Sequence, residues 1–183
     1  MKILNVTIPI SPPKVKHLAD IALFCLLTIL IHYGFRYWAG HLHYYPIADP
    51  ISNINSGLSQ LVFHQSSFLI EHILPYPFHS QELTMYINDG YISIRAGCSG
   101  LKQFLQAALL FLIFPGPWKH KLWFIPLSII LMHLVNLLRI FLLAIVVNYQ
   151  PQQFGFYHDI VFRPLFYVVI FVLWVWWVER SAK

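Results

Sequence analysis

The sequence predicts an all-α, polytopic membrane bundle of about four transmembrane helices, with a small extracytoplasmic β-hairpin and an interfacial amphipathic helix. Of the 183 residues, 58% are hydrophobic and only 10% are charged, against about 25% charged in an ordinary soluble domain. Several apolar runs approach the length of about 20 residues that a bilayer crossing takes. The composition excludes a soluble globular enzyme, a disordered regulator, a coiled coil and a disulfide-stapled module.

The whole chain, residues 1–183, is expected to form a single integral membrane domain. Its first span covers residues 18–38 and ends in Arg36-Tyr37-Trp38, which is typical of a membrane interface. This ending lacks the small residues of a cleavage site, so we expect the span to be retained. Cys25 lies within the span as a packing or lipid-facing residue, too far from Cys98 for a disulfide.

Residues 39–97 are expected to form an extracytoplasmic segment. Within it, residues 51–74 mix apolar residues with Ser, Asn, Gln and His, and several apolar residues share one helical stripe: Leu58, Leu61, Val62, Phe68 and Leu69. The pattern indicates an amphipathic interfacial helix, and a fifth span is the alternative. Residues 83–95 surround Asn88-Asp89-Gly90, which is strong turn chemistry and predicts a β-hairpin.

Residues 98–178 carry the core spans in which we expect the catalytic groups. The second span covers about 98–114 and stops at Pro115-Gly116-Pro117, which breaks a helix. The third covers about 122–148 and the fourth about 160–178.

The distribution of basic residues predicts the topology. With the N-terminus in the cytoplasm, the cytoplasmic segments hold seven of the 12 basic residues, as the positive-inside rule expects: Lys2, Lys14, Lys16, Lys119, Lys121, Arg180 and Lys183. The other five lie near the outer face: Arg36, Arg95, Lys102, Arg139 and Arg163. No Lys/Arg run typical of a nucleic-acid-binding arm is present, so the expected partner is the lipid bilayer and not nucleic acid.

This topology brings three reactive side chains to one depth. Cys98 opens the second span at its outer end, and His158 precedes the fourth span. Arg139 lies about nine residues, or roughly 13 Å, before the outer end of the third span. An arginine inside a span is costly and usually marks a function. Among the carboxylates only Asp159 is close to Arg139 by depth.

The surroundings of Cys98 favour a reactive thiol. The N–H groups and the dipole of a helix N-terminus stabilise a thiolate. Lys102 follows Cys98 at i+4 on the same helical face. Either its charge lowers the pKa of the thiol, or its side chain extends to the membrane interface. We predict that the residues around the thiol bind substrate: Gly97, Ser99, Gly100, Lys102 and Asn136.

Three short motifs together resemble the exosortase/archaeosortase family. They are Ala96-Gly97-Cys98-Ser99-Gly100 at the start of one span, Asn136-Leu137-Leu138-Arg139 inside the next, and His158 before the last. The resemblance covers residue 98 to the C-terminus and implies a polytopic membrane cysteine transpeptidase. Such enzymes act on exported proteins that end in a short motif, a transmembrane helix and a basic tail. By this resemblance Cys98 is the nucleophile, Arg139 the family's arginine and His158 the acid and base.

The resulting hypothesis is acyl transfer at the extracytoplasmic side of the cytoplasmic (inner) membrane. The Cys98 thiolate attacks a peptide carbonyl, and His158 protonates the leaving amine. Arg139 either stabilises the developing oxyanion or holds the charge of the thiolate. An acceptor with an amine or hydroxyl group, for which a glycolipid is one candidate, then takes the exported protein for surface anchoring or export. Asp159 is expected to lie outside the triad, since a direct neighbour is poorly placed to orient His158.

No metal or organic cofactor is expected, because His41 and His43 have no second ligand cluster to complete a metal site. Two other functions stay open. A protease that hydrolyses the acyl-enzyme shares the same intermediate. A non-enzymatic membrane scaffold or transporter subunit would line a polar pathway with Arg139 and Lys102, and Cys98 would then be incidental.

Overall fold

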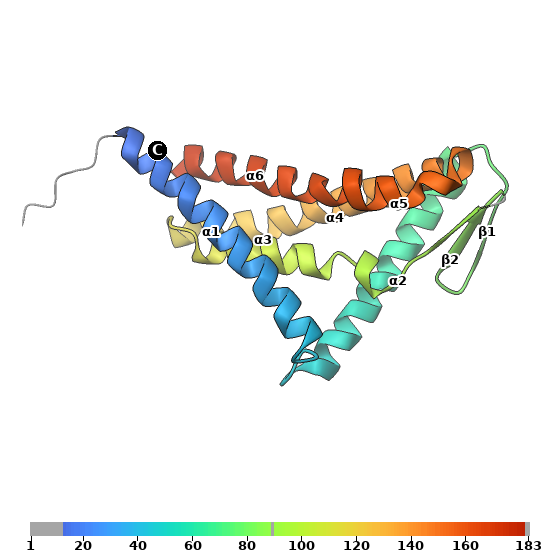
Figure 1. The fold of residues 1–183 in the computed structure, drawn as a ribbon, viewed down its shortest axis with the longest axis horizontal. Helices are drawn as coiled ribbons and strands as arrows, with labels where there is room; N and C mark the ends of the chain where they lie inside the picture. Colours follow the sequence, from blue (N-terminus) through green and yellow to red (C-terminus); the bar gives the residue numbers. More distant parts are fainter. Residues whose placement is uncertain (1–12, 89, 182–183) are drawn as a thin grey trace, which may run out of the picture.

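The structure is a helical bundle with a small sheet at one end (Figure 1). The computed structural model describes residues 13–88 and 90–181. The long helices are α1 (Pro13–Gly40), α2 (Ala48–Ile73), α4 (Trp118–Tyr149) and α6 (Phe162–Ser181). Helices α4 and α6 run side by side along the longest axis, whereas α1 and α2 are oblique to them and meet at their connection. The predicted membrane all-α class is confirmed.

Within residues 13–88 and 90–181, three helical segments are long and apolar enough to cross a membrane. They are His17–Gly40, Trp118–Tyr149 and Pro151–Arg180, with mean hydropathies of 2.0, 2.5 and 2.0. They coincide with the first, third and fourth predicted spans. In the most apolar stretch of the first segment, only 6% of the residues are buried inside the protein. Its exposed leucines and isoleucines therefore suit a lipid environment.

The second predicted span is shorter than expected. Helix α3 covers only Leu101–Ile113, or roughly 20 Å, against a hydrocarbon core of about 30 Å. The chain first forms a 3₁₀ turn at Ala96–Cys98, and Gly100 then adopts a left-handed conformation with φ of 85°. Helix α3 consequently begins three residues later than predicted, and Phe114 leaves the helix in an extended conformation before Pro115. The structure thus has three full-length candidate spans and one short apolar helix.

Helix α2 is the predicted amphipathic helix and is not among the helices apolar enough to cross a membrane. Its buried residues recur at helical spacing: Ile51, Ser59, Val62, Phe63, Ser66 and Ile70. Leu61 and Phe68, which we expected on this stripe, are 45% and 60% exposed. The buried stripe is rotated from the expected one because α2 packs against α4 and the sheet through the side that carries Ser59 and Ser66.

The predicted hairpin is part of a three-stranded antiparallel sheet in the order β1-β2-β3. The strands are β1 (Phe78–Gln81), β2 (Thr84–Ile87) and β3 (Gly90–Ser93). Asn88 has a φ of 49°, as the turn between β2 and β3 requires; Asp89 lies outside the described residues. Strand β1 was not predicted, because its sequence is mostly polar and three of its four residues are exposed.

Two side-chain bonds tie the sheet end of the molecule to the end of α4. The Tyr76 hydroxyl donates to the Tyr149 hydroxyl at 2.6 Å, and Asn88 bonds to Asn148. One face of the sheet also packs on α4 through residues that are almost fully buried: Met85, Ile87 and Ile92. The position of β3 is therefore fixed relative to α4.

Several element ends gather at two opposite ends of the molecule. The start of α1, the end of α6 and the α3–α4 connection lie at the left of Figure 1, the sheet and the end of α4 lie at the right, and the α1–α2 connection lies below, at neither end. Lys119 and Lys121 at the start of α4 and Arg180 near the end of α6 therefore lie at the end opposite the sheet.

Gly100 is a conformational requirement of this fold. A Cβ at this position meets the Phe104 ring at 2.8 Å, and the left-handed conformation costs an ordinary residue about 1–2 kcal/mol. Gly100→Ala should lower the free energy of unfolding by at least that amount, measured by thermal unfolding of the purified protein in detergent. In the control Gly57→Ala, no heavy atom lies within 4 Å of the new Cβ, and this helical position should gain stability. Equal melting temperatures for the two variants would contradict the assignment.

Candidate active site

Cys98 lies on a short loop between the sheet and α3. The backbone N–H of Cys98 donates to the carbonyl of Arg95 at 2.7 Å and closes the 3₁₀ turn. The next residue, Ser99, is 1% exposed. Its Oγ bonds to Asn55 Oδ1 at 2.5 Å and accepts the N–H of Leu101 at 3.2 Å. Ser99 therefore caps α3 and ties the loop to α2.

Asn136 holds the same loop from the other side. Its Nδ2 donates to the carbonyl of Cys98 at 2.8 Å, and its side chain is fully buried. Because Asn136 belongs to α4, the Cys98 loop has a hydrogen bond to the helix that also carries Arg139. Asn136 is a positioning residue in this arrangement.

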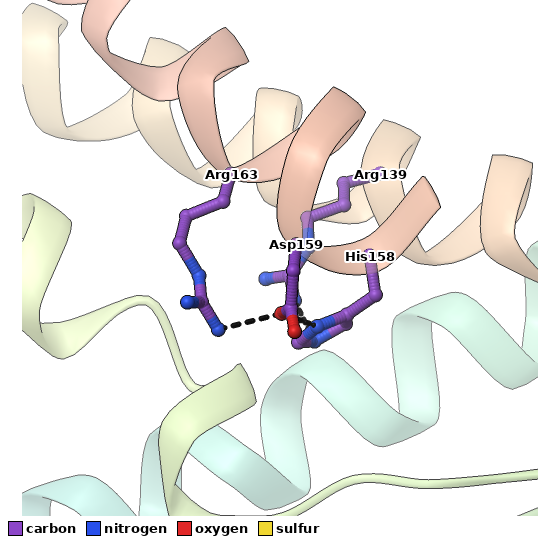
Figure 2. A network of polar contacts seen from close by, with 4 residues as sticks. All are labelled: Arg139, His158, Asp159 and Arg163. Atoms are coloured by element: carbon purple, nitrogen blue, oxygen red, sulfur yellow. Dashed lines mark hydrogen bonds and ion pairs between the residues drawn. The ribbon is translucent and has the colours of Figure 1, made fainter. Parts of the chain in front are cut away.

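Four side chains form a polar network beside the loop, as Figure 2 shows. Arg139 Nη2 donates to His158 Nε2 at 2.5 Å, and His158 Nδ1 bonds to Asp159 Oδ1 at 2.6 Å. Arg163 Nη2 also bonds to Asp159 Oδ1, at 2.7 Å. Since a guanidinium only donates, Nε2 accepts, and the neutral imidazole carries its proton on Nδ1, where it donates to Asp159.

The contact between His158 and Asp159 corrects the expectation that a direct neighbour is poorly placed. The segment Tyr157–Val161 is a π-helix, whose wider turn changes the side-chain directions of an α-helix. Arg163 lies at i+4 from Asp159 and holds the carboxylate on the side that faces the imidazole. Asp159 is thereby a positioning residue for His158.

The charges around Cys98 favour its thiolate. Burial raises the pKa of the Cys98 thiol, but the neighbouring His158 imidazole, the backbone of Arg95 and the positive charge of Arg139 outweigh this effect and lower the pKa. The net effect is a pKa below the ordinary value. The source of the effect differs from the prediction, because Cys98 precedes α3 and is not part of its first turn.

Arg139 is 5% exposed and packs over the ring of Phe166, with 5.8 Å between the guanidinium carbon and the ring centroid. Its Nε has no hydrogen-bond partner within the described part of the chain. A buried donor without a partner is costly, and a ligand oxygen would satisfy it.

One cavity of about 720 Å³ joins these groups. Cys98, Arg139 and His158 all line it, together with Gly97 and strand β3. Apolar residues of α4 and α5 (Phe154–Phe156) complete the wall: Ile140, Leu143, Val147 and Phe154. The three residues predicted to be catalytic therefore share one accessible space.

Most of the predicted substrate-binding residues do not line this cavity. Of the five, only Gly97 does so, and a Cβ there would meet no atom within 4 Å. Ser99, Gly100 and Asn136 are buried beneath the loop. Lys102 is on α3, where the i+4 relation to Cys98 does not hold because the helix begins at Leu101.

Several residues at the cavity were not predicted as site residues from the sequence, and three of them lie close to the reactive groups by charge or ring contact. They are Arg95, Phe154 and Arg163. Arg163 at i+4 from Asp159, and Phe154 at i−4 from His158 with 5.5 Å between ring centroids, both carry a helical spacing signal. Arg95 carries no such signal, since its place depends on the register of β3.

Fold and site together define a helical membrane protein with a cysteine, a histidine and an arginine around one cavity. The model of the transmembrane exosortase family matches residues 14–177, and the chain belongs to this family. The match extends well before Cys98, where the resemblance seen in the sequence began. No curated protein and no solved structure gave a significant match.

The thiol of Cys98 should ionise at an unusually low pH. In a Cys25→Ser background, the rate of alkylation by iodoacetamide should rise with pH and reach half its maximum at a lower pH than the alkylation of free cysteine in the same detergent buffer. His158→Gln removes the imidazole that stabilises the thiolate and should move this midpoint to a higher pH. The rate at each pH is followed by mass spectrometry of the Cys98 peptide. An unchanged midpoint in His158→Gln would contradict the contact.

Proposed function

We propose that this exosortase-family protein is a membrane cysteine transpeptidase that uses Cys98 as its nucleophile. The observation that carries the proposal is the cavity of about 720 Å³ shared by Cys98, Arg139 and His158. Each of the three groups has a distinct chemical task in acyl transfer, and no metal or organic cofactor is needed for any of them.

Activation of the thiol begins with a proton transfer. The Cys98 proton moves to His158 Nε2, and the imidazolium is stabilised by Asp159 at Nδ1. A protonated Nε2 can no longer accept from Arg139, so the guanidinium is released toward the new negative charge. This exchange couples the charge of the thiolate to the orientation of Arg139.

Acylation then follows in two stages. The thiolate attacks the carbonyl carbon of a peptide bond, and the carbonyl oxygen becomes an oxyanion to which Arg139 donates. The C–N bond breaks, the leaving amine takes the proton from His158 Nε2, and a thioester to Cys98 remains. The unpartnered Nε of Arg139 is a suitable second donor for the oxyanion.

Transfer to an acceptor restores the enzyme. An amine or hydroxyl group of the acceptor gives its proton to His158 and attacks the thioester carbon, and Cys98 leaves as a thiolate. A glycolipid is one acceptor with this chemistry, and water in the same place would give hydrolysis. The proposed substrates are exported proteins that end in a short motif, a transmembrane helix and a basic tail.

The location follows from the same reasoning. The protein is proposed to reside in the cytoplasmic (inner) membrane, with the site facing the extracytoplasmic side. The sheet and the loop of Cys98 then lie outside, and Lys119, Lys121 and Arg180 lie at the cytoplasmic end, as the positive-inside rule expects.

Cys98→Ala should abolish processing of a tagged exported protein with such a C-terminal signal, because no acyl-enzyme forms without the sulfur. Processing is measured in cells by the mass of the mature protein and of its new C-terminus, which also separates transfer from hydrolysis. The matched control is Cys25→Ala, which removes a thiol far from the cavity and should leave processing unchanged. Processing that survives in Cys98→Ala excludes this nucleophile and favours the scaffold or transporter function.

Arg139→Lys should lower the processing rate by roughly 10²–10³-fold although the charge is retained. A lysine lacks the planar fork of a guanidinium, so it cannot present two fixed N–H donors, such as Nη2 and Nε of Arg139, to the oxyanion. Arg180→Lys serves as the control, since Arg180 lies over Trp123 at the other end of the bundle. If Arg139→Lys processes at the normal rate, Arg139 acts only as a generic cation.

A further inference from the structure

Strand β3 is the free edge of the sheet and one wall of the cavity. The sheet order is β1-β2-β3, so β3 has a partner strand on one side only. Residues 90–95 all line the cavity that contains Cys98. An unpaired strand edge offers a row of backbone donors and acceptors to an extended peptide.

The register identifies which backbone groups are free. The N–H of Ile94 donates to the carbonyl of Leu83 at 2.8 Å, and the register places these two residues opposite each other. Hydrogen-bonded pairs alternate along an antiparallel ladder. The next bonded pairs are therefore Ile92 with Met85 and Gly90 with Ile87.

The remaining residues of β3 direct their backbone groups away from β2. These are Tyr91 and Ser93, whose N–H and C=O groups belong to non-hydrogen-bonded positions of the ladder. Neither residue makes a backbone hydrogen bond to a loop or turn elsewhere in the described chain. The free edge thus presents two donors and two acceptors.

The same edge leads to the nucleophile. Arg95 is the next residue in this alternation, and its carbonyl accepts the N–H of Cys98 at 2.7 Å. From Tyr91 to Arg95 the strand direction covers four residues, or roughly 13 Å. A peptide lying along Tyr91 and Ser93 would therefore reach the sulfur with its fourth or fifth residue.

The far side of the cavity suits the side chains of such a peptide. Leu143 and Val147 of α4 and Phe154 of α5 face the space beside β3. The start of β3 is in contact with α4, because a Cβ at Gly90 would overlap the Val147 side chain. The cavity is thus bounded at that end, and apolar walls accept alternate side chains of an extended chain.

We infer that the substrate peptide binds by strand addition to the free edge of β3, with its backbone bonded to Tyr91 and Ser93 and its scissile carbonyl at Cys98. This inference rests on the proposed function and names the binding mode of its substrate. The ligand class is an extended peptide segment on the amino side of the scissile bond. Main-chain hydrogen bonds supply the affinity and alternate side chains supply the selectivity.

The direction of the added strand follows from the proposed topology. The exported part of the substrate lies outside, beyond the sheet, and its transmembrane helix lies in the bilayer. The chain therefore enters at Tyr91 and ends at Cys98, parallel to β3. In a parallel pair, every second residue of the added strand donates its N–H to the edge.

The test uses an active-site-directed probe in place of the unidentified substrate. N-Acetyl-tetra-alanyl chloromethyl ketone alkylates a cysteine thiolate with loss of chloride, and four analogues each carry one N-methylated backbone amide. The second-order rate of Cys98 alkylation is measured on the full-length protein in detergent by mass spectrometry. Strand addition predicts that N-methylation at alternate positions slows alkylation, roughly five- to tenfold at each, and leaves the intervening positions unaffected.

A pair of variants at one position tests the protein side of the same bonds. Ser93→Pro removes the outward-facing N–H of Ser93 and leaves the hydrogen bonds between β3 and β2 intact. Proline is tolerated at such edge positions. It should slow alkylation by the unmethylated probe by a similar factor. The control Ser93→Ala keeps the N–H and should react as the unsubstituted protein does. Iodoacetamide, which has no peptide backbone to pair, should alkylate Cys98 equally in both variants.

The outcomes distinguish a failure of strand addition from a failure of the proposed cysteine nucleophile. Rates that do not depend on the N-methylated position, or that fall equally at all four, overturn strand addition while Cys98 remains a reactive nucleophile. A Cys98 that reacts with iodoacetamide no faster than a free thiol overturns the proposed function and the binding mode together. An alternating pattern that Ser93→Ala retains and Ser93→Pro weakens supports both.

Discussion

The buried guanidinium of Arg139 is the constraint on which the rest of the site depends. A charge at 5% exposure on an apolar helix is tolerated only with partners close by. His158 accepts from Nη2, and the ring of Phe166 covers the guanidinium at 5.8 Å. The chain between α4 and α6 must therefore bring His158 back over α4. That return also places the imidazole beside Cys98, so one electrostatic requirement assembles the reactive groups.

The sequence predicts those parts of the fold that depend on local composition. Apolar runs locate three of the spans, and Asn88 in the turn locates the β2–β3 hairpin. The length of α3 could not be predicted, because the left-handed Gly100 and the turn at Ala96–Cys98 depend on bonds to distant residues. Asn55 on α2 and Asn136 on α4 supply those bonds. The polar strand β1 is likewise specified by its partner strand and not by its own residues.

The sequence could predict the depth of a residue in the membrane, and this part of the candidate site was predictable. The spacing of Cys98, Arg139 and His158 along separate helices indicated a common level, and the structure places all three on one cavity. The contacts of Asp159 and Asn136 could be identified only from the three-dimensional structure. Asp159 contacts His158 because the helix widens there, and Asn136 serves the backbone of Cys98 instead of the open cavity. Neither relation follows from residue spacing on an ideal α-helix.

The short α3 has a consequence for the lipids around it. A helix of roughly 20 Å meets a hydrocarbon core of about 30 Å, and such hydrophobic mismatch is relieved when the leaflets thin around the shorter helix. Headgroups next to α3 then descend toward the level of the Cys98 loop. An amphiphile held in that dimple would carry its polar end to the proposed thioester without leaving the bilayer, whereas a soluble nucleophile would enter from the water phase.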